Sequence, residues 1–418
     1  MKKSIYIFVI LILISEMYSL KIFHSLFLGG DLGYILLYIW LLFGFIIYRR
    51  KTKNPLYKKD NLIPVCFILF GILLSMFSAY ILYGQTFIQS LIAYRRQYFW
   101  IVVFVLLYVR PSERSIIKSL NCFSIVYIVA TFLRTYILPQ WFVERELFSA
   151  PGVEMQFCIG LPLLTIPMYY YCGRVRNYFE LRDFFGVLFY AIFFVLVKNR
   201  SVLFVVIIIV AFSFITSKRK KISIPVTFIA GILFTYFTFD TFVELNDETV
   251  NQVNDADYNR VKAFDYMLFS SHKDWLAILF GKGFISSHAS SNMSNLMSMG
   301  IYNTDVGFVG YWDQYGIIPI IVFTFIIIKV LISKFVPFYI KAIGGHILVC
   351  SITISYMGYA CNIMWFTLFY YLYLYYNYRN RCSIYKYHRI LNLKNNNRLL
   401  FKKNYTLLHR SRRFHVRS

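Results

Sequence analysis

The sequence NRSVLFVVIIIVAFSFITSKRKK, residues 199–221, contains the pattern that decides the fold. Residues 201–216 carry no charge and are almost all apolar, while four cations follow at 218–221. A transmembrane helix needs about 20 mostly apolar residues. We therefore interpret 201–216 as a membrane span, with its cationic end in the cytoplasm, where Lys and Arg accumulate.

The same pattern recurs along the whole chain, which predicts an all-α polytopic membrane protein with about twelve spans. The predicted spans are 4–22, 31–48, 62–83, 98–109, 116–138, 156–172, 184–198, 201–216, 222–240, 306–332, 336–356 and 359–377. The first span imitates a signal peptide, but no small-residue cleavage site follows it, so we interpret it as a retained helix.

Composition supports this class. The 418 residues are 59% hydrophobic, against roughly 45–50% in soluble domains. The net charge of +25 would suggest a nucleic-acid partner in a soluble protein, but here the cations lie in short runs between apolar segments. The seven cysteines show no CxxC spacing, and six lie in or at the ends of apolar runs. We therefore expect no nucleic-acid partner, no disulfide framework, no metal and no cofactor.

The basic clusters indicate the orientation of the chain. With twelve spans they all fall on the side of the N-terminus, and one span more or fewer would break this alternation. Both termini are then predicted to be cytoplasmic, and the tail 379–418, which has no acidic residue, is expected to lie on anionic headgroups. The clusters are 2–3, 49–59, 110–118, 174–182, 218–221, 334–341 and the tail.

The segment 240–305 is the one long polar stretch, and it holds nine of the 19 acidic residues. The same alternation of sides predicts that it is extracytoplasmic. The chain is thus divided into spans one to nine (1–239), the loop (240–305), spans ten to twelve (306–378) and the tail (379–418).

Within the loop, RVKAFDYMLFSSHKDWLAILFGKGF (260–284) predicts an amphipathic helix. Helical spacing puts Val261, Phe264, Met267 and Leu268 on one face. We expect Gly281-Lys282-Gly283 to end the helix as a turn. Because this GxG follows a helix and not a strand, it does not predict a dinucleotide loop.

Several charged residues break the orientation rule or lie at membrane depth. Cations at the outer side oppose the charge gradient, so we expect them to have anionic partners, although snorkelling to outer-leaflet phosphates is an alternative for each. For Asp305, at the mouth of a span, capping of the helix is the alternative. Asp313, further inside the span, is expected to pair with an arginine or to bind substrate. The candidates are Arg95, Arg96, Arg200, Arg260, Asp305, Asp313 and the loop histidine His288.

The architecture and two short segments resemble the O-antigen polymerase and ligase superfamily. WLAILFGKGF (275–284) is similar to the end of that family's loop helix, and TDVGFVGYWDQYGIIP (304–319) is similar to the start of its next span. An Arg before the eighth span and an Arg opening the loop helix also match. The ligases have a His where this chain has Asp305, and this difference favours a polymerase.

The resemblance implies a GT-C-like glycosyltransferase in a bacterial inner membrane. Its donor and acceptor would be undecaprenyl-pyrophosphate-linked glycans, its surroundings membrane lipids, and a chain-length regulator is a further partner that the family suggests. Arg200 and Arg260 would stabilise the pyrophosphate, since arginine forks suit phosphate oxygens. Asp305 would be the base or hold the acceptor. Arg95, Arg96, His288 and Asp313 would contribute to substrate binding.

Two other functions remain open from the sequence. A lipid-linked oligosaccharide flippase would handle a similar substrate, but it should line a central cavity with charges and show two related halves, and neither feature is evident. A ligase would transfer the glycan to another carrier.

Overall fold

The structure is a computed structural model, and the residues that it describes form helices and turns without a strand. It describes residues 2–15, 31–48, 59–133, 161–197, 200–226, 259–270, 274–284, 306–352 and 361–380, with a few isolated positions between 228 and 250. The chain divides into two compact units, 1–373 and 374–418. A helix covers residues 361–380, and its residues 361–373 belong to the first unit.

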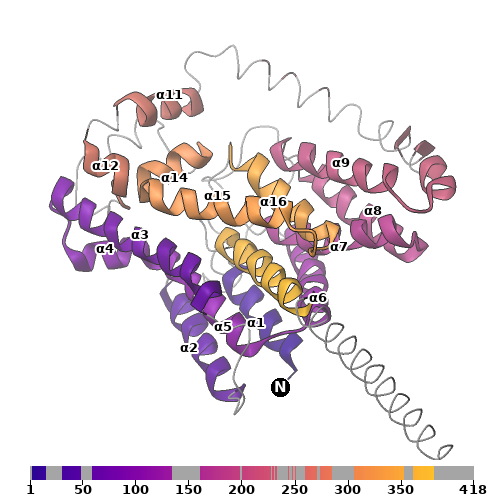
Figure 1. The fold of residues 1–418 in the computed structure, drawn as a ribbon, viewed down its shortest axis with the longest axis horizontal. Helices are drawn as coiled ribbons and strands as arrows, with labels where there is room; N and C mark the ends of the chain where they lie inside the picture. Colours follow the sequence, from indigo (N-terminus) through magenta and orange to yellow (C-terminus); the bar gives the residue numbers. More distant parts are fainter. Residues whose placement is uncertain are drawn as a thin grey trace, which may run out of the picture. The chain divides into compact units, whose positions relative to one another are not determined.

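Many helices of the first unit overlap predicted apolar runs, whereas α4 and most of η2 lie between two predicted spans (Figure 1). The helices are α1 (Lys3–Ser15), α2 (Asp31–Ile47), α3 (Lys59–Tyr83), α4 (Phe87–Ala93), η2 (Tyr94–Trp100), α5 (Ile101–Val109), α6 (Glu113–Phe132), α7 (Leu161–Asn177), α8 (Leu181–Leu196), α9 (Arg200–Ile215), α11 (Asn259–Asp265), η5 (Tyr266–Ser270), α12 (Trp275–Phe280), α14 (Gly307–Tyr315), α15 (Ile317–Ile332) and α16 (Phe338–Cys350). The all-α class is therefore confirmed for the described residues.

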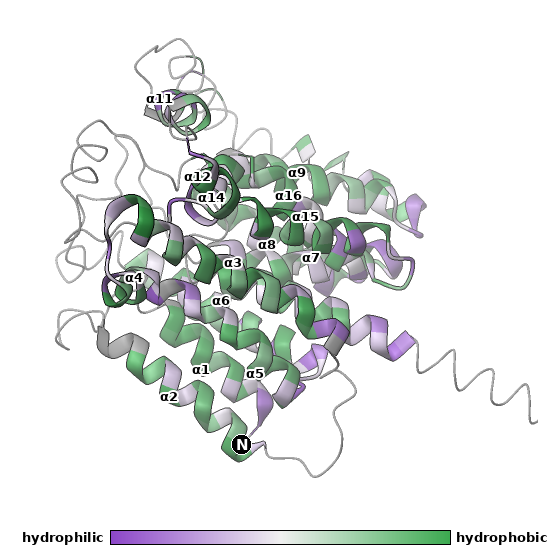
Figure 2. Ribbon diagram, turned by 60° about the vertical axis from the view of Figure 1, so that its left-hand side comes forward, coloured by the Kyte–Doolittle hydropathy of each residue, from purple (hydrophilic) through white to green (hydrophobic). Residues whose placement is uncertain are grey.

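Two described helices, Asp60–Tyr83 and Glu113–Phe132, are long and apolar enough to cross a membrane. A third span results if Phe87–Ala93 and Gln97–Val109, bent by 67°, count as one. Five shorter helices are also apolar, and Figure 2 shows how continuous the hydrophobic colouring is along the bundle. These features are compatible with membrane association, while the twelve-span topology stays a prediction.

Helix α3 exposes an apolar stripe on the outside of the bundle. Phe67, Phe70, Leu73 and Phe77 recur at helical spacing, and each side chain is at least half exposed. The opposite face of α3 is buried. A contiguous apolar surface of this kind is rare on soluble monomers and is compatible with contact to lipid.

Several helix ends that carry the basic clusters lie together, and we call this the basic end. Lys3 Nζ, at the start of α1, donates to the Arg110 carbonyl after α5 over 2.7 Å. Three residues further on, Glu113 accepts a 2.7 Å hydrogen bond from the Tyr339 hydroxyl of α16. The Phe338 ring lies 4.6 Å from the Arg176 guanidinium of α7. These contacts form one continuous series across five helix ends, those of α1, α5, α6, α7 and α16.

The last helix continues the series. The Tyr371 hydroxyl donates to the Pro111 carbonyl over 2.6 Å, and the Tyr370 hydroxyl donates to the Asn61 carbonyl at the start of α3 over 2.8 Å. The region before α3 belongs to a predicted cytoplasmic cluster, as does the turn that contains Pro111. The tertiary contacts therefore bring together helix ends that the charge pattern had assigned to one side.

The predicted span 306–332 is not one continuous helix. It breaks at Gly316 into α14 and α15, because Gly316 has φ of 76°, which L side chains rarely adopt. A Cβ at this position would lie 2.2 Å from the Leu279 carbonyl oxygen. Only glycine lets α12 approach the break this closely.

We expect Gly316→Ala to destabilise the protein by at least about 2 kcal/mol, because it adds backbone strain and a steric clash. Gly345→Ala is the matched control, since a Cβ there meets nothing within 4 Å and the residue lies inside α16. Thermal unfolding in detergent would measure both. Equal melting temperatures for the two variants would contradict the assignment.

Candidate functional site

The turn after α12 is joined to α14 by backbone hydrogen bonds, and we call residues 281–284 the glycine turn. The Lys282 amide donates to the Asp313 carbonyl over 2.6 Å, and the Gly283 amide donates to the Gln314 carbonyl over 3.0 Å. Gly281 ends α12 with φ of 74°, and a Cβ on it would lie 2.5 Å from the Gly316 amide nitrogen. The prediction that Gly281-Lys282-Gly283 ends a helix as a turn is confirmed.

The other side of the glycine turn contacts η2 and the region after α3. The Phe284 amide donates to the Tyr94 hydroxyl over 3.1 Å, and the Gln85 side-chain amide donates to the Phe284 carbonyl over 2.9 Å. Tyr94 is fully buried, and its hydroxyl lies 2.6 Å from that of Ser75 in α3. The glycine turn is thus held between α14 on one side and two buried polar side chains on the other.

Lys282 and Asp313 form a largely buried ion pair at this junction. Their Nζ and Oδ1 atoms lie 3.4 Å apart, and the side chains are 13% and 7% exposed. The Lys282 ammonium also lies 5.5 Å from the centre of the Tyr266 ring of η5. Burial, and then the negative charge of Asp313, raise the pKa of the Tyr266 hydroxyl.

Asp313 was expected to pair with an arginine or to bind substrate, and its described ionic partner is Lys282. From the sequence, Lys282 is predicted only to be part of a turn. Lys282 shares with Arg260 the property that selected Arg260: it is a cation in the predicted extracytoplasmic loop, where the positive-inside rule disfavours cations. This property could have identified Lys282. A buried carboxylate near an apolar helix needs a positive partner, and the glycine turn supplies it.

The predicted amphipathic helix differs from the observed one in length and in its buried face. It is divided into α11 with the π-helical turn η5, and α12. Ala263 and Met267 are buried against Val306, whereas the predicted face residues Val261 and Phe264 are 49% and 42% exposed. Of the predicted face, Met267 therefore packs on Val306 together with Ala263, while Val261 and Phe264 lie on an exposed side.

Three chain segments meet at the start of α14. The Phe308 amide donates to the Ser351 carbonyl after α16 over 2.8 Å. The neighbouring Cys350 thiol donates to the carbonyl of Ser201, in the first turn of α9, over 3.5 Å. Val306, on the other side, packs against Met267 of η5. The starts of α9 and α14 and the helix pair α11–η5 thus form one junction, which we call the outer junction.

The sequence-predicted residues relate to the outer junction as follows. Arg200 is the first residue of α9 and Arg260 is the second of α11, and the structure describes the backbone of both. Asp305 directly precedes Val306 in the sequence but lies outside the described residues, as does His288. The backbone segments next to the three predicted catalytic residues therefore converge.

Arg95 and Arg96 lie elsewhere, in η2. The Arg95 side chain is exposed, and its carbonyl accepts a 3.3 Å hydrogen bond from the Tyr38 hydroxyl of α2. The Phe284 amide of the glycine turn donates to the hydroxyl of the neighbouring Tyr94. Arg95 and Arg96 therefore flank the Lys282–Asp313 region and not the outer junction.

A scan against protein-family models and a search of curated proteins each found no match to this chain.

Removing one partner of the Lys282–Asp313 pair should lower the stability of the folded protein more than removing both charges. We expect Lys282→Met to lower stability by about 3–5 kcal/mol, because it leaves a buried carboxylate without its cation. The double variant Lys282→Met/Asp313→Asn should be clearly more stable than the single one. Unfolding curves of the four proteins in a double-mutant cycle would test this, and strictly additive effects would refute the coupling.

Proposed function

We propose that this protein is an inner-membrane polysaccharide polymerase that joins lipid-pyrophosphate-linked repeat units at the extracytoplasmic face. The observation that carries the proposal is the outer junction. The helix that begins next to Arg260 packs on Val306, the residue after Asp305. The helix that begins at Arg200 contacts Cys350, whose neighbour Ser351 accepts a hydrogen bond from Phe308. These segments lie far apart in the sequence, so their convergence is not a consequence of chain proximity.

The reaction that we propose matches the chemistry of these residues. The anomeric carbon of the donor glycan loses its bond to the lipid pyrophosphate, which leaves with the electron pair. A hydroxyl of the acceptor unit forms the new glycosidic bond, and its proton passes to Asp305. Two arginines would stabilise the negative charge that develops on the pyrophosphate.

The proposed topology has about twelve spans, both termini in the cytoplasm and the loop 240–305 outside. Support comes from the basic end, where the starts of α1, α3 and α16 lie with the end of α7. The outer junction contains the start of α9 and the end of α16. The other ends of these two helices lie at the basic end. Lipid-linked sugars would reach the outer junction after they have been flipped across the membrane.

Arg200→Ala and Arg260→Ala should each abolish long polymer while a single surface repeat unit remains, because the leaving group would lose its cationic stabilisation. Removing one such group commonly costs about 10²–10³ in rate. Lys substitutions should retain part of the activity, since charge survives without the bidentate fork. Arg114→Ala, an exposed arginine of the basic end, is the control. Gel analysis of surface polysaccharide, with immunoblots for protein level, gives the readout.

Asp305→Asn should give the same single-repeat phenotype, because an amide cannot accept the proton of the attacking hydroxyl. Asp265→Asn, in the same loop region, is the matched control and should leave chain length unchanged. Normal polymer in the Asp305→Asn strain would remove this residue from catalysis.

Deletion of the gene separates the polymerase from the two alternatives. Loss of a polymerase leaves one repeat unit at the surface, whereas loss of a flippase leaves no glycan there. Loss of a ligase leaves polymer on its lipid carrier. Either of the last two outcomes would overturn the proposal.

A further inference from the structure

The turns after α7 and after α9 present a group of cations at the basic end, and we call Arg176, Lys218, Arg219, Lys220 and Lys221 the basic patch. The backbone joins its two halves, since the Lys218 amide donates to the Arg176 carbonyl over 2.8 Å. Two buried serine hydroxyls shape the second half. That of Ser217 donates to the Val175 carbonyl, and that of Ser223 donates to the Phe214 carbonyl. The patch is therefore a defined surface and not only a basic stretch of sequence.

Arg176 is oriented by two aromatic rings. Its guanidinium lies 4.6 Å from the centre of the Phe338 ring and 6.0 Å from that of Phe212, and these rings are stacked on each other. Cation–π contacts of this kind hold the planar group in place while its N–H donors remain available. The four cations from Lys218 to Lys221 are exposed.

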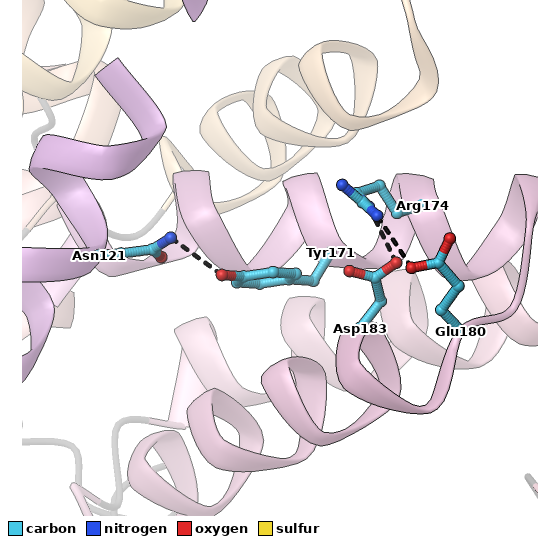
Figure 3. Close-up of polar contacts among 5 residues, drawn as sticks. All are labelled: Asn121, Tyr171, Arg174, Glu180 and Asp183. Atoms are coloured by element: carbon cyan, nitrogen blue, oxygen red, sulfur yellow. Dashed lines mark hydrogen bonds and ion pairs between the residues drawn. The ribbon is translucent and has the colours of Figure 1, made fainter. Parts of the chain in front are cut away.

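The acidic residues nearest in sequence do not neutralise the patch, because Arg174 binds them (Figure 3). Arg174 Nε lies 2.8 Å from Asp183 Oδ2, and its NH2 group lies 3.1 Å from Glu180 Oε2. Asp183 is 1% exposed and so is turned away from solvent. Within the described part of the chain, the basic patch therefore carries positive charge that local carboxylates leave uncompensated.

Apolar side chains surround the same turns. Leu181 at the start of α8 is 66% exposed, Ile215 at the end of α9 is 60% exposed, and Ile222 and Ile224 are about half exposed. Cations next to exposed aliphatic side chains are typical of a membrane interface, where charge meets headgroups and the apolar part meets acyl chains.

We infer that the basic patch is a binding surface for the phosphate headgroup of an anionic phospholipid. Arg176 supplies the oriented fork, Lys218 to Lys221 supply the surrounding charge, and the aliphatic side chains cover the start of the acyl chains. The inference concerns the membrane-facing surface and does not depend on the proposed polymerase reaction.

The test titrates the detergent-solubilised full-length protein with phosphatidylglycerol and counts bound lipid by native mass spectrometry. Lys218→Gln/Arg219→Gln should weaken binding by about fivefold for each cation removed. Arg114→Gln/Lys118→Gln is the matched control, since it removes two exposed cations from α6. It should bind like the parent. Arg176→Lys, which keeps the charge but loses the planar fork, should fall between the parent and the double variant.

Thermal unfolding without lipid checks that all variants fold, which we expect because the substituted lysines and arginines of both pairs are exposed. Phosphatidylglycerol should raise the melting temperature of the parent, while phosphatidylcholine and inorganic phosphate should not. Equal loss of binding in the two double variants, or equal stabilisation by phosphatidylcholine, would overturn the inference. Equal stabilisation by inorganic phosphate would also overturn it, because the site would then recognise a free anion.

Discussion

The contact between two glycines, Gly281 and Gly316, is the constraint on which the loop side of the structure depends. Neither position has room for a Cβ, and both have positive φ. Their close approach lets the backbone of the glycine turn pair with that of α14, and this pairing places the Lys282 ammonium against the Asp313 carboxylate. The ion pair would be costly without this geometry, because both charges are largely removed from water. Backbone sterics thus come first, and the electrostatic contact follows from them.

The basic end and the outer junction differ in the kind of contact that holds their helix ends together. At the basic end, cations meet carbonyls, aromatic rings and a few carboxylates, as in the Lys3–Arg110 and Arg176–Phe338 contacts. At the outer junction, the contacts are mostly backbone hydrogen bonds and small buried side chains such as Ala263. The first arrangement suits binding of fixed anionic headgroups. The second joins the start of α9 to the end of α16, and the helix pair α11–η5 to Val306 before α14.

Most helices could be predicted from the sequence because apolar runs of this length have few alternatives to helix in a membrane. Their exact ends could not, and α7 continues past its predicted end to include Arg174 and Arg176. The break at Gly316 was missed because hydropathy does not register a backbone conformation, and the apolar run continues across it. Periodicity grouped Val261, Phe264 and Met267 on one face of the loop helix, but only the packing shows that Ala263 and Met267 are the residues that contact Val306.

For the candidate site, the sequence by itself determined which residues carry charge against the orientation gradient, since that requires only the order of apolar and charged segments. It therefore selected Arg200, Arg260, Asp305 and Asp313. Only the tertiary structure decided that Lys282 is the described ionic partner of Asp313, that α11–η5 packs on Val306, and that the start of α9 contacts the end of α16. These contacts join residues far apart in the chain. They arise from the packing of helix ends, which local sequence patterns do not encode.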